Sequence, residues 1–372
     1  MSRHQRLNTY GITKTSLFQR LHLDPLLTTF IFILSLTGII LLFSASSGGY
    51  GMVNRQVIRL LVAFIFFLLF AQVPAYKYKH WAPYLFSIGM VLLISVLLIG
   101  KVGKGAQRWL DLGFFRFQPS EIMKIIVPMM LAWYFSHQLL PIHFKNVIWA
   151  ALIIILPALL IVKQPDLGTA LMLIFSGCVV LFFAGISYRL IALFSVFCLA
   201  LAPFLWHMMH GYQKLRVLNF LDPERDPLGS GYHIIQSKIA IGSGGLLGKG
   251  FLNGSQSHLH FLPEHATDFI FAVLGEEVGL IGCLLVIFLF FLIVYRSLHI
   301  AYLSQDIFSK LLVVSLSMNF FLSAFVNMGM VAGILPVVGI PLPLVSYGGS
   351  SMLVFFASFG MIMSVASAEN SP

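Results

Sequence analysis

Apolar runs long enough to cross a lipid bilayer recur along the whole sequence, separated by short polar stretches. A helix needs roughly 17–25 predominantly apolar residues to span the hydrocarbon core. Runs near that length predict about ten transmembrane helices, at residues 26–44, 57–73, 81–100, 120–135, 147–162, 167–185, 188–206, 268–294, 309–333 and 343–366. The sequence therefore predicts an all-α polytopic membrane protein in which residues 1–372 form a single transmembrane domain.

The composition excludes a soluble fold. Hydrophobic residues make up 59% of the chain and charged residues only 10%, whereas soluble domains carry about 25% charged residues. The first apolar run is too long for a cleaved signal peptide and lacks an A-x-A-like cleavage site. We therefore expect it to remain in the protein as a signal anchor. Cys178, Cys198 and Cys283 lie in apolar runs without C-x-x-C spacing, which favours core packing and implies no disulfide framework.

Basic residues ahead of the first helix set the predicted orientation. Arg3, Arg6, Lys14 and Arg20 precede it, and cytoplasmic flanks are enriched in Lys and Arg. We therefore expect a cytoplasmic N-terminus, and an even number of helices returns the C-terminus to the same side. Residues 207–267 then form one large extracytoplasmic loop between the seventh and eighth helices.

The extracytoplasmic segments carry more positive charge than such segments normally do. Within 101–119 and 207–267 the basic residues are Lys101, Lys104, Arg108, Arg116, Lys214, Arg216, Arg225, Lys238 and Lys249. This excess indicates an anionic partner at the outer leaflet, such as a phosphate-bearing lipid head group. Arg108, Arg216 and Lys238 are the candidate binding residues. The alternatives are an inverted topology or pairing of these residues with local acids.

Two further features of the large loop can be interpreted. Residues 232–241 predict a short amphipathic helix lying at the membrane interface. The run GSGGLLGKG (242–250) is not a nucleotide-binding loop. A Walker loop needs Ser or Thr after its lysine, whereas Gly250 follows Lys249 here.

Two polar helix starts resemble each other, QPSEIMK (118–124) and QPDLGTA (164–170). Glu121 in a first turn complements the helix dipole, and Lys124 shares its face three residues on. The pair is either a capping acid with an intrahelical ion pair or a charged pair facing a substrate cavity. Asp166 is predicted to cap the helix that begins in QPDLGTA. It is also a candidate substrate-binding residue.

The stretch PEHATDFIFAVLGEE (263–277) brings carboxylates into an apolar helix. Asp268 is either a helix-start acid after Thr267 or a group that touches the substrate. A carboxylate at an outer helix mouth beside basic loops suits a general base acting on a hydroxyl. The basic groups would then hold the charge of a departing diphosphate.

Nearby histidines, His258, His260 and His265, are predicted to be solvated loop residues, because H-x-H on a loop is weak evidence for metal ligation. We therefore assign no metal site to the protein's own side chains.

The last motif is NMGMVAGILPVVGIPLPLVSYGGSSM (327–352). Pro336, Pro341 and Pro343 prevent a regular helix. Irregular backbone at membrane depth is tolerated only when it is buried in protein or lines a cavity. We predict a re-entrant or broken segment that acts as a hinge or as a cavity wall, and Ser346 is its candidate substrate-binding residue.

Several of these motifs also resemble the SEDS family (shape, elongation, division and sporulation proteins). The matching blocks, in order, are QPSEIMK, QPDLGTA, FLDPERDPLGSGY (220–232), PEHATDFIFAVLGEE, and Asn327 with GILP (333–336), Gly339 and LVSYGGSS (344–351). The resemblance covers essentially the whole chain. SEIMK and QSKIAIGSGGLLGKG (236–250) are similar to the rod-shape (RodA-type) members rather than to the division (FtsW-type) paralogues.

The resemblance implies a bacterial inner-membrane peptidoglycan glycosyltransferase. Such enzymes polymerise lipid II into β-1,4-linked glycan strands and release undecaprenyl diphosphate. It further implies that Asp268 is the catalytic residue and that Glu121 and Lys124 line the same cavity. The implied partners are a class B penicillin-binding transpeptidase and other elongation proteins, with no nucleic acid, and a divalent cation (Mg or Mn) at the diphosphate is conceivable.

Two other functions fit parts of the pattern. A lipid II flippase would also use many helices, buried charges and a broken helix, and a membrane scaffold could hold the same charges structurally. A transporter needs a polar path from the cytoplasmic leaflet, but the motif acids cluster toward the outer ends of their helices. That placement favours chemistry on the outer face.

Overall fold

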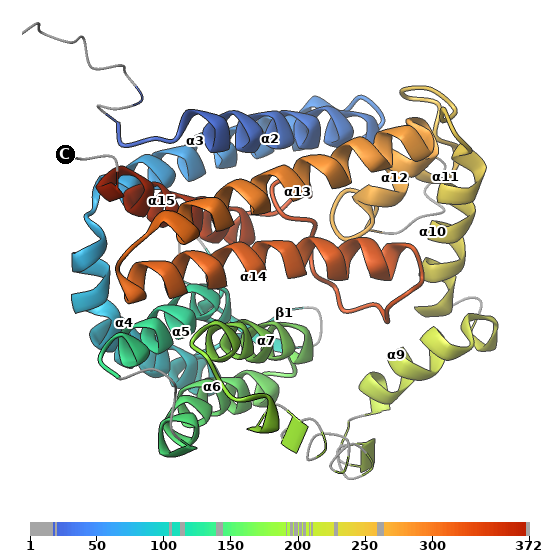
Figure 1. Ribbon diagram of the computed structural model, residues 1–372. Coiled ribbons are helices and arrows are strands. Elements are labelled where there is room, and N and C mark those ends of the chain that lie inside the picture. The colour runs from blue at the N-terminus through green and yellow to red at the C-terminus, as the bar shows by residue number, and fades with distance from the viewer. Residues whose placement is uncertain are drawn as a thin grey trace, which may run out of the picture.

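The computed structural model describes residues 21–103, 106–111, 116–138, 144–190, 211–226, 230–258 and 264–369, together with Phe18 and isolated positions from 192 to 209. The described chain is mostly helical (Figure 1). Its elements are α2 Pro25–Ala45, α3 Tyr50–Gln72, α4 Ala75–Ile99, β1 Lys101–Gly103, β2 Ala106–Asp111, β3 Arg116–Phe117, α5 Pro119–Ser136, α6 Phe144–Lys163, α7 Leu167–Phe183, α9 Gly211–Leu221, the 3-10 turn η1 Pro223–Arg225, α10 Ser230–Gly244, α11 Ser255–His258, α12 Ile270–Glu277, α13 Gly279–Leu303, α14 Ile307–Val331 and α15 Ser350–Glu369.

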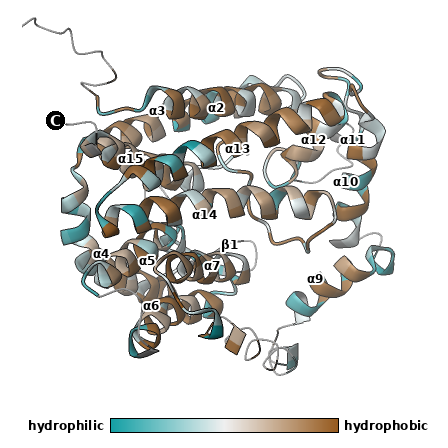
Figure 2. Cartoon of the chain, viewed as in Figure 1, coloured by the Kyte–Doolittle hydropathy of each residue, from teal (hydrophilic) through white to brown (hydrophobic). Residues whose placement is uncertain are grey.

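Most residues of the predicted apolar runs that the structure describes lie in helices. Seven helices of the described residues are long and apolar enough to cross a membrane, and α7 is a shorter apolar helix. In Figure 2 hydrophobic colour follows the helices along their lengths and hydrophilic colour gathers near their ends. The predicted span 188–206 lies mostly outside the described residues, so the total of ten spans stays a prediction.

The helices begin where the sequence provides capping groups. Asp24 accepts a hydrogen bond from the Leu27 backbone N–H at 2.9 Å and caps α2, and Asp306 caps α14 in the same way. Pro119 occupies the first turn of α5, as predicted. Side-chain oxygens at these positions satisfy backbone N–H groups that have no partner within the helix.

The centre of the molecule is formed by α14 and α15, whose side chains are largely buried. Around them, α14 packs against α5, α7 and α13, and α15 packs against α3. By contrast, α3 and α4 carry many exposed Leu, Ile and Phe side chains. Apolar side chains on the outer surface of such a bundle suit contact with lipid.

The described chain begins and ends at one face of the bundle. The Asp24 backbone N–H lies 3.2 Å from Met363 Sδ, and Ser364 Oγ donates to the Val73 carbonyl at 2.5 Å. We call this end the terminal face. The opposite end, which carries β1–β3 and the starts of α5 and α7, is the site face (Figure 1).

One helix predicted as continuous is broken in the structure. The run 268–294 is not a single helix, because it breaks between α12 and α13 at Gly279, whose φ is +75°. The 245–250 loop packs into the break: the Lys249 and Gly250 N–H groups donate to the Glu276 and Glu277 carbonyls, each at 3.0 Å. A Cβ on Gly279 would lie 2.4 Å from the Gly248 nitrogen. The glycine-rich run therefore closes a helix break, a structural role.

Two other differences concern non-spanning segments. Residues 101–117 form a three-stranded antiparallel sheet in the order β1-β2-β3, with Leu110 opposite Phe117, which the apolar pattern did not predict. Residues 232–241 do lie within a helix, α10, as predicted. Residues 332–349 contain no helix, which confirms the predicted broken segment, and so α15 starts at Ser350 rather than near 343.

Candidate functional site

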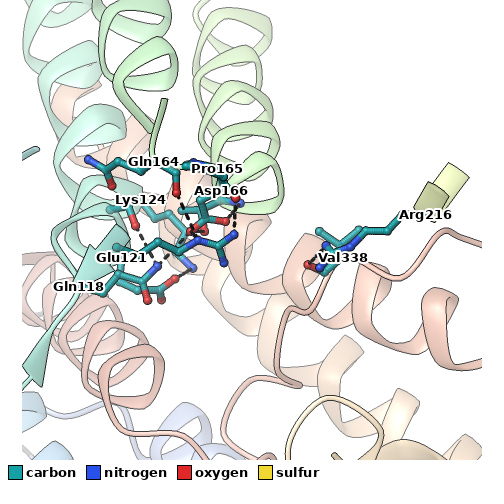
Figure 3. Close-up of polar contacts among 11 residues, drawn as sticks. Gln118, Glu121, Lys124, Gln164, Pro165, Asp166, Arg216 and Val338 are labelled. Carbon is teal, nitrogen blue, oxygen red and sulfur yellow. Dashed lines mark hydrogen bonds and ion pairs between the residues drawn. The ribbon is translucent and has the colours of Figure 1, made fainter. Parts of the chain in front are cut away.

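The start of α7 is bound to the sheet and to the start of α5 (Figure 3). Arg108, on β2, donates to the Pro165 carbonyl, and its Nε lies 3.8 Å from Asp166 Oδ2. Gln118 Nε2 donates to the same Asp166 oxygen at 3.1 Å. Asp166 also caps α7, since its carboxylate accepts from the Thr169 N–H at 3.3 Å and from the Thr169 hydroxyl at 3.0 Å. The predicted cap is confirmed, and the same carboxylate joins three elements.

Glu121 and Lys124 form a buried ion pair one turn inside α5. The Lys124 Nζ lies 2.7 Å from Glu121 Oε1, and their side chains are only 5% and 10% exposed. Among the residues that the structure describes, Glu121 Oε2 is buried with no hydrogen-bond partner. A buried acceptor without a partner is unfavourable. The pair is thus an intrahelical ion pair whose second carboxylate oxygen has no protein partner among the described residues.

Asp268 lies in a turn that spans residues 264–269, two residues ahead of α12. Phe269 is the N-cap residue of α12, and no side chain caps that helix. Asp268 therefore lies one residue before the N-cap, and both interpretations of this acid stay open here. Asp268 is half-buried.

The broken segment 332–349 holds this turn in place. Asn327 Nδ2, near the end of α14, donates to the Asp268 carbonyl at 2.8 Å and to the Ile340 carbonyl at 2.7 Å. Ser346 Oγ donates to the Thr267 carbonyl at 2.5 Å and accepts from the Leu342 N–H. These bonds hold the backbone of Thr267 and Asp268 from two sides.

Three other segments contact Val338 and Gly339 of the broken segment. A Cβ on Gly339, whose φ is +79°, would lie 3.5 Å from Asp268 Oδ2. Arg216 Nη1, on α9, donates to the Val338 carbonyl at 3.3 Å (Figure 3). A Cβ on Gly168, in the first turn of α7, would lie 2.5 Å from Val338 Cγ1. Asp268, the α7 start and a cationic guanidinium are thereby brought to one stretch of backbone.

The remaining predicted residues occupy different positions. Lys238, on α10, is exposed, and its Cε passes over Gly333 at the end of α14. Ser346 is 4% exposed and its hydroxyl bonds to backbone groups, so its observed contacts support the Asp268 turn. Arg216 is exposed, with its guanidinium at Val338 as described.

Several residues of this arrangement were missed in the sequence. Gln118 and Gln164 each precede a proline in the two similar helix starts, a repeat that could have identified them. Gln164 Nε2 donates to the Leu93 carbonyl at 3.0 Å and fastens α7 to α4. Arg59 lies 4.4 Å from the centre of the Tyr347 ring. Arg59 could have been identified in the sequence because it is the one basic residue in the apolar run 57–73.

The carboxylates deeper in α12 are structural. Glu276 is fully buried and its Oε1 lies 2.7 Å from Lys249 Nζ, and Ser255 Oγ donates to it at 3.0 Å. Glu277 accepts from Ser44 Oγ on α2 at 2.5 Å. Both acids fix the helix break to its neighbours.

No cluster of three His, Cys, Asp or Glu side chains occurs within the described residues. His260 and the His258 side chain lie outside the described part, and His265 is half-buried. The structure places the half-buried Asp268 beside Gly339, and the Arg216 guanidinium binds the neighbouring Val338 carbonyl. Mg²⁺ commonly binds through one or two carboxylates together with substrate phosphates, so this donor set fits a cation that arrives with a diphosphate.

We expect Asn327→Leu to lower the activity of the protein without abolishing it. Leu has a similar volume but cannot donate to the Asp268 and Ile340 carbonyls, so two buried acceptors lose their partner at about 1–3 kcal/mol each. Initial rates and the thermal unfolding midpoint of the purified variant check this. Asn319→Leu, a matched change on the same helix whose amide lies 3.5 Å from the Lys124 carbonyl, should leave the Asp268 turn and most activity intact. Equal activity losses in the two variants would contradict the role of Asn327.

The sequence and the fold are both similar to those of known proteins. The FTSW_RODA_SPOVE family model, described as "Cell cycle protein", matches residues 21–371. Peptidoglycan glycosyltransferase MrdB of Escherichia coli K12 is 49% identical over 353 residues, which cover 95% of each chain. A solved chain from a peptidoglycan synthase complex that coordinates polymerization and crosslinking is 31% identical, with a TM-score of 0.80 over 93% of this chain and 98% of that chain. Rod shape determining protein RodA of Thermus thermophilus is 25% identical, with a TM-score of 0.71 over 93% of this chain and 97% of that chain.

Proposed function

The chain belongs to the FTSW_RODA_SPOVE family and is a peptidoglycan glycosyltransferase of cell elongation in the bacterial inner membrane, and we propose that Asp268 is its general base. The supporting observation is the placement of that carboxylate. The backbone of Asp268 is fixed by Asn327, while the carboxylate lies beside Gly339 at the site face.

The proposed reaction joins two lipid II molecules. Asp268 accepts the proton of the acceptor sugar's 4-hydroxyl as its oxygen attacks C1 of the donor sugar. The C1–O bond to the diphosphate breaks, its electron pair leaves with undecaprenyl diphosphate, and a β-1,4 linkage forms. One proton moves to Asp268 and is returned to solvent before the next cycle.

The leaving diphosphate needs compensating positive charge. Arg108 lies at the start of α7, Arg216 at the Val338 carbonyl, and Lys124 is buried one turn inside α5. Fixed cations at the place where charge develops stabilise a transition state. When bound, a Mg or Mn ion would supply further charge neutralisation, and Asp268 and the diphosphate oxygens are the groups that would hold it.

This chemistry sets the orientation and the partners that we propose. The site face lies outside the membrane, so the terminal face and both chain termini are cytoplasmic, with residues 207–267 as the large outer loop. A class B penicillin-binding transpeptidase would crosslink the strands that leave the site. The similarity to a chain of a peptidoglycan synthase complex supports such an assembly.

A flippase is the competing function. The buried ionisable residues of the described chain gather at its two ends, with Asp24 at the terminal face and Glu121, Lys124, Asp166, Glu276 and Glu277 toward the site face. A transport path would need polar groups that connect those ends. The described bundle offers mainly Ser and Asn side chains between them, which favours chemistry at one face.

The test uses detergent-purified full-length protein with lipid II, alone and with the transpeptidase. We expect glycan strands to form and undecaprenyl diphosphate to accumulate in proportion to the linkages made. In cells, the chain should restore rod shape to bacteria depleted of their elongation polymerase but should not restore septation to cells depleted of the division polymerase. Lipid II movement across liposomes without polymer would favour the flippase, and rescue of division alone would favour the FtsW-type assignment.

A further inference from the structure

A cavity of about 450 Å³ opens at the terminal face, at the opposite end of α4 and α5 from the candidate active site. Its lining residues are Tyr76, Lys77, Lys79, His80, Trp81, Trp133 and His137. The first five belong to the N-terminal turns of α4 and the last two to the C-terminal end of α5. Ligand pockets typically have volumes of roughly 300–1,000 Å³, so the cavity is large enough for a small polar group.

The lining is basic and aromatic, with little opposing charge. Lys79 Nζ lies 3.8 Å from Asp306 Oδ1, and the other Asp306 oxygen is occupied by Ser309. Within the described part of the chain, Lys77 makes no ion pair. The first turn of α4 has no acidic residue and no side-chain cap. The cavity therefore has positive charge that the protein leaves uncompensated.

His137 uses one of its two ring nitrogens to bind the protein backbone. Its Nδ1 lies 2.8 Å from the Trp133 carbonyl, which can only accept, so Nδ1 carries the proton. The other ring nitrogen, Nε2, remains available to a ligand, and the ring rests 5.0 Å from that of Trp133. A protonated His137 would donate from Nε2 to an anion in the cavity.

The position of the cavity along α4 places it at the level of lipid head groups. The 25 residues of α4 span about 37 Å at 1.5 Å per residue, more than the roughly 30 Å of the hydrocarbon core. Tyr76 and Trp81 are 69% and 42% exposed, and such side chains are enriched at membrane interfaces. The cavity mouth thus meets the phosphate layer of the leaflet.

We propose that this cavity binds the phosphate of an anionic phospholipid in the leaflet that borders the terminal face. Lys77 and Lys79 attract the phosphate, the imidazolium form of His137 donates to it from Nε2, and Trp81 and Trp133 pack against the glycerol and upper acyl chain. Basic pockets between spanning helices suit acidic head groups. This site is separate from the Asp268 region and does not depend on the proposed general base.

The test is native mass spectrometry of the full-length protein titrated with phosphatidylglycerol, phosphatidylcholine or inorganic phosphate. Wild-type protein is expected to retain phosphatidylglycerol in preference to phosphatidylcholine, and Lys77→Gln/Lys79→Gln should weaken that binding by about tenfold. Lys77→Gln alone, which keeps the Lys79–Asp306 contact, should show a partial loss. Lys310→Gln, an exposed lysine in the first turn of α14 at the same face, is the matched control and should bind as wild type does.

Three results would overturn the proposal. They are equal retention of the two lipids, equal losses in Lys310→Gln and in the double variant, and binding of inorganic phosphate that matches phosphatidylglycerol. Polymerisation of lipid II in detergent reports on folding, because none of these lysines belongs to the active site. A double variant that polymerises normally yet loses phosphatidylglycerol supports the site directly.

Discussion

Asp268→Asn is expected to reduce lipid II polymerisation by about 10²–10⁴-fold, the usual contribution of a general base. The amide has the size of the carboxylate but cannot accept a proton at neutral pH. The turn should persist, because Asn327 bonds to the backbone carbonyl of residue 268 rather than to its side chain. Steady-state polymerisation rates, with thermal unfolding and transpeptidase binding of the same preparations, measure the effect.

The matched control for that variant is Glu224→Gln. Glu224 is an exposed acid in η1, between α9 and α10, so the change removes one negative charge without touching the arrangement around Val338. We expect near-normal polymerisation. A strong loss in both variants would mean that net charge, and not proton transfer by Asp268, governs the rate.

The second large effect is expected at the buried ion pair of α5. Glu121→Gln leaves the Lys124 ammonium in a nearly dry site, where removing one partner costs about 3–5 kcal/mol. The side-chain exposures of 5% and 10% leave little room for water to compensate. Denaturation of purified protein should show the loss as a lower unfolding midpoint, and activity should fall with it.

A double variant separates stability from function at this pair. Glu121→Gln/Lys124→Met removes both charges and should recover much of the unfolding midpoint, because an uncharged pair needs no compensation. If the pair contacts substrate, the double variant stays nearly inactive despite its recovered fold. Recovery of activity together with stability would show that the pair only supports the helix.

Features encoded by neighbouring residues could be predicted from the sequence. The apolar runs gave the helices α2 to α7, because the length of a run limits what can cross a bilayer. Asp166 was identified as a cap from its place before Leu167, and the structure confirms it. The prolines of 332–349 indicated irregular backbone, since they remove N–H donors that a helix needs.

Features that depend on contacts between distant residues could not be predicted from the sequence. The break between α12 and α13 arises because the 245–250 loop reaches into it, and nothing within 268–294 alone signals that contact. The position of Asp268 depends on Asn327, 59 residues away. Asn327 stood inside a recognisable motif, but a buried asparagine has no periodicity that identifies its partners. The candidate acid was therefore predictable and its support was not.

The central claim is that Asp268 acts in the bond-forming step rather than in holding the substrate. Single-turnover transfer by wild type and Asp268→Asn, each saturated with lipid II whose binding is measured in the same samples, tests it most directly. The account predicts similar lipid II affinity and a transfer rate at least about 10²-fold lower in the variant. A variant that binds lipid II far more weakly but transfers at the wild-type rate once saturated would contradict it.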